Sequence, residues 1–581
     1  MANLRPWLIP VLVVFGSVAS ARGEIRTDFE FEQDPEIHVP DVIKVFSKRF
    51  KPLWLEALAR PEVDMQRMAA DAIDRAHAAG CPNLEDAASA LTGILTDPKS
   101  HPAARHAAAK ALVSLQSKAT AAILAESAEK YGADLRLIVE PALASWNYEP
   151  HRAIWQGRLT KIGVHRRDLI LAMRCLATAG DDSHVATLVE IAHDRYRPPD
   201  VRLEAANAAG LLQGSGLEAD ARRLISGAPG VPVINRLCAA RLLGRHGADA
   251  QMLLSELATD AEPAVAVLGL RRLIEIDPHL ALPLVEKSMQ NADANVRQTA
   301  ADPYILLPDP QRVAVLARLL DDPHPTVRRY VCNALHQLAQ RPELDQPIRQ
   351  VATGILAGDR WRGIEQAALL LSALDHKPAA GRLVELLEFD RPEVRNATGW
   401  GLKKLAIPET LPAMLDKARR SAAIARAGTA PGGQDEQTAH LFEAFGRMKY
   451  TEADSLMREY VPKNLLLGIN SRSAAIWSLG LLHAGVPDEQ LAAQFLERAN
   501  DLAGIPPEMP PVREMSIVSI GRMKAVSQIA ALQAMGAEKP APSRVGMIMR
   551  WSLMELTGKQ IPEPKPMIVG ETGWFLEPVD E

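Results

Sequence analysis

The chain has 581 residues, of which 47% are hydrophobic and 24% are charged, and its formal net charge is -5. This is a globular composition, which excludes a disordered or a membrane-embedded chain, and the length exceeds what one ordinary core spans. The negative net charge gives no general attraction to a phosphate backbone, so nucleic acid is not expected as a partner.

The first 21 residues, "MANLRPWLIPVLVVFGSVASA", predict a secretory signal peptide. Arg5 precedes an apolar run from Trp7 to Val18, and Ala19-Ser20-Ala21 supplies the small residues of a cleavage site. The run is too short for a comfortable membrane span, and no other stretch approaches about 18 uninterrupted apolar residues. We expect an exported protein, periplasmic or extracellular, that meets a membrane only if its signal is left uncut.

Residues 22–60 follow as an N-terminal extension. They begin with the acidic, polar stretch "RGEIRTDFEFEQDPE" and continue into "PDVIKVFSKRFKPLWLEALA", which predicts a capping helix for the array that follows. The extension is atypical of the rest of the chain, as the end of a repeat array should be.

An internal repeat then fills residues 61–420. Val327 is followed by apolar residues 4, 7, 8 and 11 positions later, which marks one face of a helix. From 104 to 394, such anchor positions recur every 31 to 34 residues. The thirteen anchors are Val63, Ala104, Leu135, Asp168, Val201, Pro232, Val265, Val296, Val327, Trp361, Val394, Ser471 and Val512. An arginine follows nine of them, far more often than composition allows: Arg105, Arg136, Arg202, Arg297, Arg328, Arg362, Arg395, Arg472 and Arg513.

Each repeat unit is predicted to be a helix, a tight turn with Asp and often Pro, and a second helix. In "DDPHPTVRRYVCNALHQLA", residues 321–339, Asp322 can accept hydrogen bonds from the free amides at the start of the second helix. Pro325 suits the first helical position, where no amide is needed.

The pattern D-x-x-P-x-V-R-x-x-A-x-x-A-L-x-x-L, as it stands in residues 322–338, resembles the HEAT-repeat family of armadillo-type proteins, here of a bacterial exported type. The resemblance covers roughly residues 60–555. It implies an all-α fold, an α-solenoid of about 13 stacked helix-turn-helix repeats whose second helices line the inner curve. It also implies that acidic turn residues and anchor arginines link neighbouring repeats, which assigns this role to Asp293, Asp322 and Asp390 with the nine arginines above.

Three further segments complete the predicted organisation. Residues 421–436 include the Gly/Pro-rich "ARAGTAPGGQDE" and predict a loop or hinge, residues 437–558 hold C-terminal repeats, and residues 559–581 form an extended tail. The apolar side chains of the tail need burial, which favours a strap over the last repeat; a partner-binding peptide is the alternative.

Candidate chemistry is sparse. Cys332 and His336 lie one helical turn apart, but two ligands are too few for a metal and equivalent positions in other repeats are ordinary, so we expect a buried thiol beside a surface histidine. No nucleophile, phosphate-binding or zinc motif appears. No cofactor or metal is expected.

Exposed aromatic residues and arginines remain as candidate partner-binding positions. Trp146, Tyr148 and Trp155 form the densest aromatic cluster, for which packing between two repeats is the favoured interpretation and partner binding the alternative. Arg329 belongs to a set of Arg-Arg pairs for which scattered solvated charge is the favoured interpretation and a basic stripe along the inner curve the alternative. We therefore expect a non-catalytic exported scaffold that binds protein partners through its concave surface. An accessory or chaperone-like subunit of an exported enzyme or polysaccharide-handling complex is the alternative.

Overall fold

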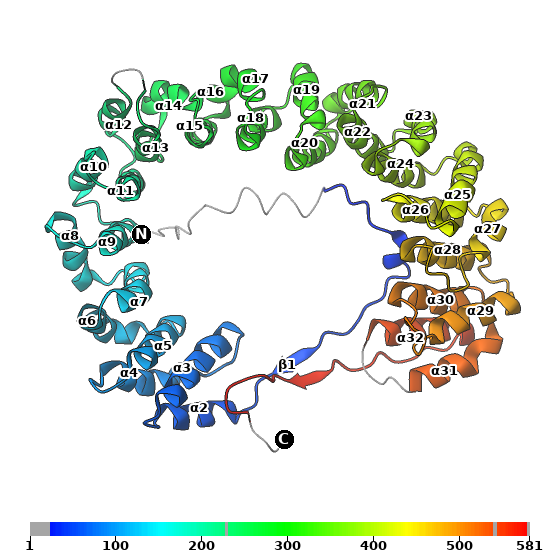
Figure 1. The fold of residues 1–581 in the computed structure, drawn as a ribbon, viewed down its shortest axis with the longest axis horizontal. Helices are drawn as coiled ribbons and strands as arrows, with labels where there is room; N and C mark the ends of the chain where they lie inside the picture. The colour runs from blue at the N-terminus through cyan, green and yellow to red at the C-terminus, as the bar shows by residue number, and fades with distance from the viewer. Residues whose placement is uncertain (1–23, 227–229, 538–542, 578–581) are drawn as a thin grey trace, which may run out of the picture. The chain divides into compact units, whose positions relative to one another are not determined.

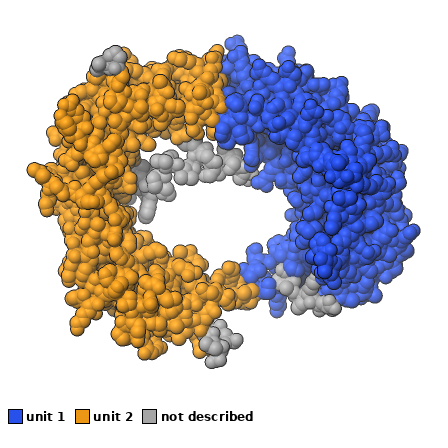
Figure 2. Space-filling model, viewed as in Figure 1, with its two compact units in different colours: residues 1–42, 304–567 blue, residues 43–303, 568–581 orange. Residues whose placement is uncertain are grey.

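The computed structural model describes residues 24–226, 230–537 and 543–577, so the predicted signal peptide lies outside the described part. These residues form two compact units, and each unit combines two separate stretches of the chain (Figure 2). Unit 1 contains residues up to 42 together with 304–567, and unit 2 contains residues 43–303 together with 568 onward. Within the described ranges, no helix has both the length and the apolar character needed to cross a membrane.

Unit 2 consists of paired helices and one short two-stranded sheet (Figure 1). Its elements are β1 (Ile43–Val45), α2 (Phe50–Leu58), α3 (Val63–Ala78), α4 (Ala88–Thr96), α5 (Pro102–Ser114), α6 (Ala121–Tyr131), α7 (Ala133–Ser145), α8 (Arg152–Thr160), α9 (Arg166–Thr178), α10 (Val185–His193), α11 (Pro199–Leu212), α12 (Glu218–Ile225), α13 (Val233–Leu242), α14 (Gln251–Ala258), α15 (Pro263–Ile276), α16 (Pro278–Ala281), α17 (Val285–Ser288), α18 (Ala294–Leu306) and β2 (Ile568–Gly570).

The chain passes from unit 2 into unit 1 within α18, and unit 1 continues the helical pairs. Its helices are α19 (Pro310–Ala317), α20 (Pro325–Leu338), α21 (Pro342–Leu356), α22 (Trp361–Ala373), α23 (Ala380–Glu385), α24 (Pro392–Leu405), α25 (Leu411–Arg426), α26 (Gln434–Arg447), α27 (Asp454–Arg458), α28 (Ile469–Leu482), α29 (Glu489–Asn500), α30 (Pro510–Arg522), α31 (Ile529–Ala537) and α32 (Arg544–Thr557). Short 3-10 turns accompany them, among them η1 (Glu30–Glu32).

The predicted all-α solenoid is confirmed. Each of the thirteen anchors lies within a second helix of a pair, or directly before it in the case of Pro232. The turn before α20 shows why: Pro325 occupies the first helical position, and Asp322 Oδ1 accepts a hydrogen bond of 2.8 Å from the amide of His324. The capping aspartate and the proline of the turn thus determine where a second helix starts, and its apolar face, repeating every 3.6 residues, determines which side is buried.

Successive second helices of unit 1 pack directly on one another through small side chains. Ser478 Oγ donates to the carbonyl of Phe442 at 2.7 Å, and Gly446, one turn further along α26, leaves room for the serine. The same arrangement joins α28 to α30 and α30 to α32, and we call it the serine–glycine ladder. Its members are Ser478 with Gly446, Ser519 with Gly480, and Ser552 with Gly521.

Substituting Gly446 by alanine is expected to destabilise unit 1 by about 1–3 kcal/mol, because the added Cβ would lie 2.7 Å from the Cα of Ser478 and the two helices would have to move apart. Gly157→Ala is the matched control. The Cβ added in α8 meets no atom within 4 Å, so this variant should gain about 0.5–1 kcal/mol. Denaturant melts of both variants would measure the difference, and equal stabilities would contradict the role of the ladder.

Two predicted boundaries need correction. The segment 421–436 is mostly helical: α25 continues to Arg426 and α26 begins at Gln434, so the connection is limited to residues 427–433. The alanine-rich end of α25 remains helical. Gly433, directly before α26, has a φ of 77°, a left-handed conformation that glycine adopts readily. The predicted capping helix is likewise shorter, since residues 43–45 form β1 and only α2 is helical.

The C-terminal tail packs against the first helices of unit 2. β2 pairs in parallel with β1, in the register Ile43 to Ile568, and Trp54 Nε1 donates to the carbonyl of Phe575 at 2.6 Å. The ring centroids of Trp574 and Trp54 are 6.0 Å apart, and the guanidinium of Arg75 lies 5.2 Å from the ring of Trp574. The expected strap over the last repeat is therefore wrong for residues 568–577, although the start of the tail does meet that repeat, where Arg550 Nε of α32 donates to the carbonyl of Ile561 at 2.8 Å. Ile568 and Val569 are 68% and 37% exposed, so the burial expected from their apolar character is not found.

Candidate functional site

An extended stretch of chain lies along the second helices of unit 1. Residues 24–35, the N-terminal segment, make a 3-10 turn at Glu30–Glu32 and contact α20, α24, α26, α28, α30 and α32 (Figure 1). The side chains of these helices that contact the segment form what we call the segment-binding face: Arg329, Asn333, Lys403, His440, Glu443, Arg447, Trp477, Arg522 and Arg544.

A buried ion pair forms the centre of this face. Lys403 Nζ lies 2.7 Å from Glu443 Oε2, and the two side chains are 2% and 0% exposed. The other carboxylate oxygen of Glu443 accepts hydrogen bonds from the amides of Glu30 and Phe31, at 2.5 and 3.1 Å. Burial alone would raise the pKa of Glu443, but the hydrogen bond from His440 and the Lys403 charge outweigh it and hold the pKa below its ordinary value. Glu443 is therefore an ionised acceptor for main-chain amides.

Aromatic rings of the segment lie beside this centre. The rings of Phe29 and His440 are 4.7 Å apart, Phe29 and Phe31 stack at 5.2 Å, and Phe31 is 1% exposed. Burial lowers the pKa of His440 despite its contact with Glu443, so the imidazole is neutral at neutral pH and offers an apolar ring face to Phe29. Phe31 is the buried anchor of the segment.

Basic and indole groups hold the distal end of the segment. Trp477 Nε1 donates to the carbonyl and to the carboxylate of Asp34, at 3.1 and 3.0 Å, and Arg522 pairs with the same carboxylate at 2.5 Å. Arg544 Nη2 donates to the carbonyl of Glu32 at 2.7 Å. Donors from three helices, α28, α30 and α32, thus hold residues 32–34.

The N-terminal end of the segment, at residues 24 and 25, is held by longer contacts. Arg329 Nε lies 3.7 Å from Glu24 Oε1, and Asn333 Oδ1 accepts from the amide of Ile25 at 3.1 Å. Arg447 pairs with Glu30 at 2.8 Å in the middle of the segment. Arg329, a predicted partner-binding residue, thus lies on the segment-binding face, where its partner is a carboxylate of this chain.

The predicted aromatic candidates lie elsewhere, in unit 2. Trp155 is 0% exposed and its Nε1 donates to Glu140 Oε2 at 3.1 Å, so it packs between α7 and α8, as the favoured interpretation of the cluster expects, and is not an exposed binding anchor. Trp146 and Tyr148 are half-buried against the core, with Trp146 Nε1 donating to Gln116 at 2.9 Å. Trp155 lies on the buried side of α8, at the junction of two repeats. Its position in the sequence does not by itself show which side of the helix it occupies.

The anchor arginines follow a shared pattern. Their guanidinium groups mostly donate to carbonyls of the turn or helix end just before their own helix, as when Arg328 Nη1 binds the carbonyl of Asp322 at 2.8 Å. Arg105, Arg202, Arg297, Arg395, Arg472 and Arg513 make the corresponding contacts.

Several anchor arginines also reach the next repeat. Arg136 pairs with Asp168 at 2.8 Å, and Arg472 forms a two-pronged pair with Glu508 at 2.8 and 2.7 Å. Arg362 differs, since its guanidinium lies over the ring of Trp361.

The acidic turn residues of the predicted ladder act on the backbone. Asp293 Oδ1 accepts from the amides of Asn295 and Val296, at 2.8 and 3.2 Å, as a cap for α18. Asp322 does the same for the turn before α20, and the carbonyl of Asp390 accepts from Arg395 at 2.8 Å. These residues fix the turn, and the arginine then ties the turn to its helix.

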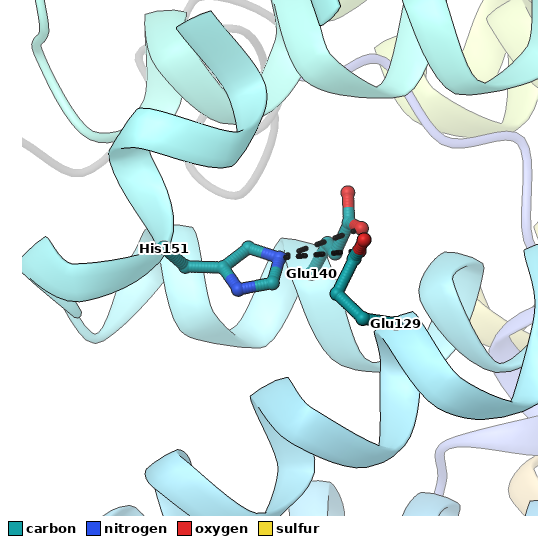
Figure 3. A group of neighbouring side chains, drawn as sticks. All are labelled: Glu129, Glu140 and His151. Atoms are coloured by element: carbon teal, nitrogen blue, oxygen red, sulfur yellow. Dashed lines mark ion pairs between the residues drawn. The ribbon is translucent and has the colours of Figure 1, made fainter. Parts of the chain in front are cut away.

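One group of side chains has the spacing of metal ligands (Figure 3). His151 Nε2 lies 3.5 Å from Glu140 and 4.0 Å from Glu129. Arg158 donates to Glu140 at 2.9 Å and to Glu129 at 2.5 Å. Burial would raise the pKa of Glu140, but the bonds from His151 and Arg158 lower it. The guanidinium of Arg158 thus balances the charge of both carboxylates. The cluster is a structural ion-pair network between two repeats.

Cys332 is buried, and its Sγ lies 3.5 Å from the carbonyl of Gln366. Burial raises the pKa of its thiol to about 12, so it is a poor ligand and nucleophile. Cys175 and Cys238 are also buried, whereas Cys81 is half-buried.

The residues that matter most on the segment-binding face were not singled out in the sequence. Lys403 lies nine positions after the anchor Val394, outside the apolar offsets of 4, 7, 8 and 11, and Glu443 lies in α26, which contains none of the thirteen anchors. The repeat pattern therefore marks neither position as buried. A buried charge requires a partner, because an isolated one is costly, but that rule can be applied only once the burial is known.

Comparisons with known proteins agree with the helical repeats. A family model described as HEAT repeat matches residues 313–341, which correspond to α19 and α20. A comparison with curated protein sequences finds no match.

Solved structures give broader similarity. Kap95p in a structure concerned with RanGDP aligns with 87% of this chain and 72% of its own, at 12% identity and a TM-score of 0.53. The Kap95:Nup1 complex aligns over the same shares at 12% identity and a TM-score of 0.51, and yeast importin-beta (Kap95p) at 13% identity and 0.48. The family-model match identifies a HEAT repeat at residues 313–341, and the two structures with a TM-score above 0.5 show that the chain has an all-α solenoid fold.

Proposed function

We propose that this protein is a non-catalytic, exported scaffold that binds protein partners through the inner helices of its HEAT repeats. The observation that carries the proposal is that these helices already hold a stretch of extended polypeptide, residues 24–35, by main-chain and side-chain contacts. A surface built in this way is suited to another polypeptide, since an extended chain offers the same amides and carbonyls whatever its origin.

Two further observations support the proposal. The similar solved structures are those of Kap95p with RanGDP and with Nup1, so this fold binds protein partners elsewhere. The sequence at residues 1–21 has the charged, apolar and small-residue regions of a secretory signal, which supports export. The cluster of Glu129, Glu140 and His151, outside the segment-binding face, has the guanidinium of Arg158 as its counter-charge.

Affinity capture from the natural host would test this function. The full-length chain with a C-terminal tag would be expressed there, cell fractions separated, and cross-linked partners identified. The test variant is Arg447→Ala with Arg544→Ala, whose side chains are 43% and 40% exposed, and the control is Arg222→Ala on α12, at 46%.

We expect the protein in the exported fraction with a stoichiometric protein partner, captured equally by the control and at least tenfold less by the double variant. Retention in the cytoplasm would refute export. Absence of a partner, or capture that is indifferent to the double variant, would refute binding through this face.

A further inference from the structure

We propose that the segment-binding face recognises an acidic, phenylalanine-containing extended segment of a partner protein, and that residues 24–35 are the resident occupant which the partner displaces. The inference rests on the proposed function and adds to it the chemistry of the partner. It also makes the N-terminal segment an intramolecular competitor for the site.

The segment-binding face first recognises the main chain of its ligand by hydrogen bonds. Glu443 accepts two successive amides, while Lys403, Trp477 and Arg544 each donate to a carbonyl, of Asp28, Asp34 and Glu32. These contacts fix the main chain of residues 28–34, including its 3-10 turn at Glu30–Glu32, without depending on its side chains. A face that only needed covering with apolar residues would not direct four polar groups at peptide bonds, of which Lys403, Glu443 and Trp477 are buried and costly to leave without a partner.

The face then selects for acidic side chains. Arg447 pairs with Glu30, Arg522 with Asp34 and Arg329 with Glu24, at distances of 2.8, 2.5 and 3.7 Å. Residues 24–36 carry six acidic side chains and one basic one, Arg26. This charge complementarity favours an acidic ligand and disfavours a basic one.

Phenylalanine completes the recognition. Phe31 is 1% exposed, and Phe29 packs on the neutral ring of His440. The 3-10 turn at Glu30–Glu32 brings the two rings together, because they stack with centroids 5.2 Å apart. A ligand of the type acidic–Phe–acidic–Phe–acidic therefore matches the side chains of the segment-binding face.

The edges of the occupied face are open, which permits exchange. The side chains of Asp34, Glu24 and Glu30 are 45%, 34% and 31% exposed, and those of Arg329 and Arg447 are 64% and 43% exposed. Each exposed ion pair contributes little stability, so most of the free energy that binds the segment to the face comes from the contacts of Phe31 and Glu443. A competing segment can replace the outer contacts before it displaces the anchor.

A synthetic peptide provides the probe. The fluorescein-labelled peptide EIRTDFEFEQDPE, residues 24–36, would be titrated into the full-length chain by fluorescence anisotropy. Because the resident segment is tethered beside its site at an effective concentration in the millimolar range, the wild-type chain should bind the probe weakly. Phe31→Ala with Asp34→Ala removes two anchors of the resident segment and should strengthen probe binding at least tenfold.

Asp34→Ala alone removes only a half-exposed side chain, so it tests competition in a chain that keeps Phe31 packed. It should strengthen probe binding about threefold, by the loss of one partly exposed, charge-assisted contact. Adding Arg447→Ala and Arg544→Ala to the Phe31/Asp34 variant should weaken probe binding at least tenfold, and Arg222→Ala in the same background should not.

Control peptides separate the two parts of the recognition. A probe with Ala at the two Phe positions, and one with Asn and Gln at the acidic positions, should each bind at least tenfold more weakly than the parent peptide. Equal binding of either control would overturn the proposed partner chemistry. Equal binding of the probe to the wild-type chain and to both resident-segment variants would overturn the competition.

The outcomes also distinguish this inference from the scaffold function. If Arg447→Ala with Arg544→Ala abolishes partner capture while the probe binds no variant, the scaffold function stands and the acidic, Phe-containing ligand is refuted. If the probe binds as expected but no partner is captured, peptide recognition stands and the scaffold function is refuted.

Discussion

Replacing Glu443 with alanine is expected to lower the free energy of unfolding of unit 1 by about 3–5 kcal/mol. The variant leaves the ammonium of Lys403, 2% exposed, without the carboxylate that lies 2.7 Å away, and a buried charge without a partner is strongly destabilising. It also removes the acceptor of the Glu30 and Phe31 amides. Hydrogen exchange of the α24 and α26 amides would measure the loss.

The double variant Lys403→Met with Glu443→Leu is the control. It removes both charges and fills the volume with apolar side chains, so most of the stability of the repeats should return. The N-terminal segment should nevertheless remain loose, because its acceptor is gone, and its amides should exchange rapidly. Unchanged stability in Glu443→Ala, or no recovery in the double variant, would contradict the assignment of a buried ion pair.

The pH dependence of this pair has a definite sign. The pKa of Glu443 is lower in the folded chain than in the unfolded one, so the unfolded state binds the proton more readily. The stabilisation is fully present above the ordinary value of a glutamate, about 4.3, and is lost as the pH falls through the depressed folded value. Glu443→Ala should accordingly lose less stability than the wild-type chain on acidification.

Replacing Trp54 with alanine should cost unit 2 about 3–5 kcal/mol and release the C-terminal tail. The indole is 0% exposed, stacks on Phe50 with ring centroids 5.4 Å apart, and donates to the carbonyl of Phe575 at 2.6 Å. The cavity removes contacts to α2 and to the tail together. Thermal melts would report the stability, and limited proteolysis would report cleavage within residues 568–577.

Trp54→Phe separates packing from hydrogen bonding. It keeps a ring but removes the indole N–H, so the expected loss is about 0.5–1.5 kcal/mol from the unsatisfied carbonyl, with smaller release of the tail. If Trp54→Ala leaves the tail as protected from protease as in the wild-type chain, the indole is not its anchor.

Local chemistry made most of the fold predictable. The anchor at Val327, the proline at 325 and the capping Asp322 specify a helix start within six residues of sequence, and their recurrence specifies a stack. The serine–glycine ladder also has a local signature, Ser-x-Gly in "SLG" at 478–480 and "SIG" at 519–521. Such patterns carry information because the interacting residues are few positions apart or recur at constant spacing.

The site was less predictable for a physical reason. The segment-binding face depends on hydrogen bonds between residues that are 308 to 512 positions apart, such as Glu30 with Glu443. A single sequence shows that Phe31 is apolar and that Lys403 is charged, but not that they belong to one surface. Trp155 shows the converse, because a conspicuous aromatic residue turned out to be buried.

The exchange of chain ends between the two units has a consequence for synthesis. Glu30 is 413 residues from its acceptor Glu443, and Trp54 is 521 residues from Phe575. At ribosomal rates of about 5–20 residues per second, the early partner waits on the order of a minute for the late one. Neither unit can therefore reach its final state until translation is nearly finished, and the high contact order of these terminal pairings should make their docking the slow, last event in folding.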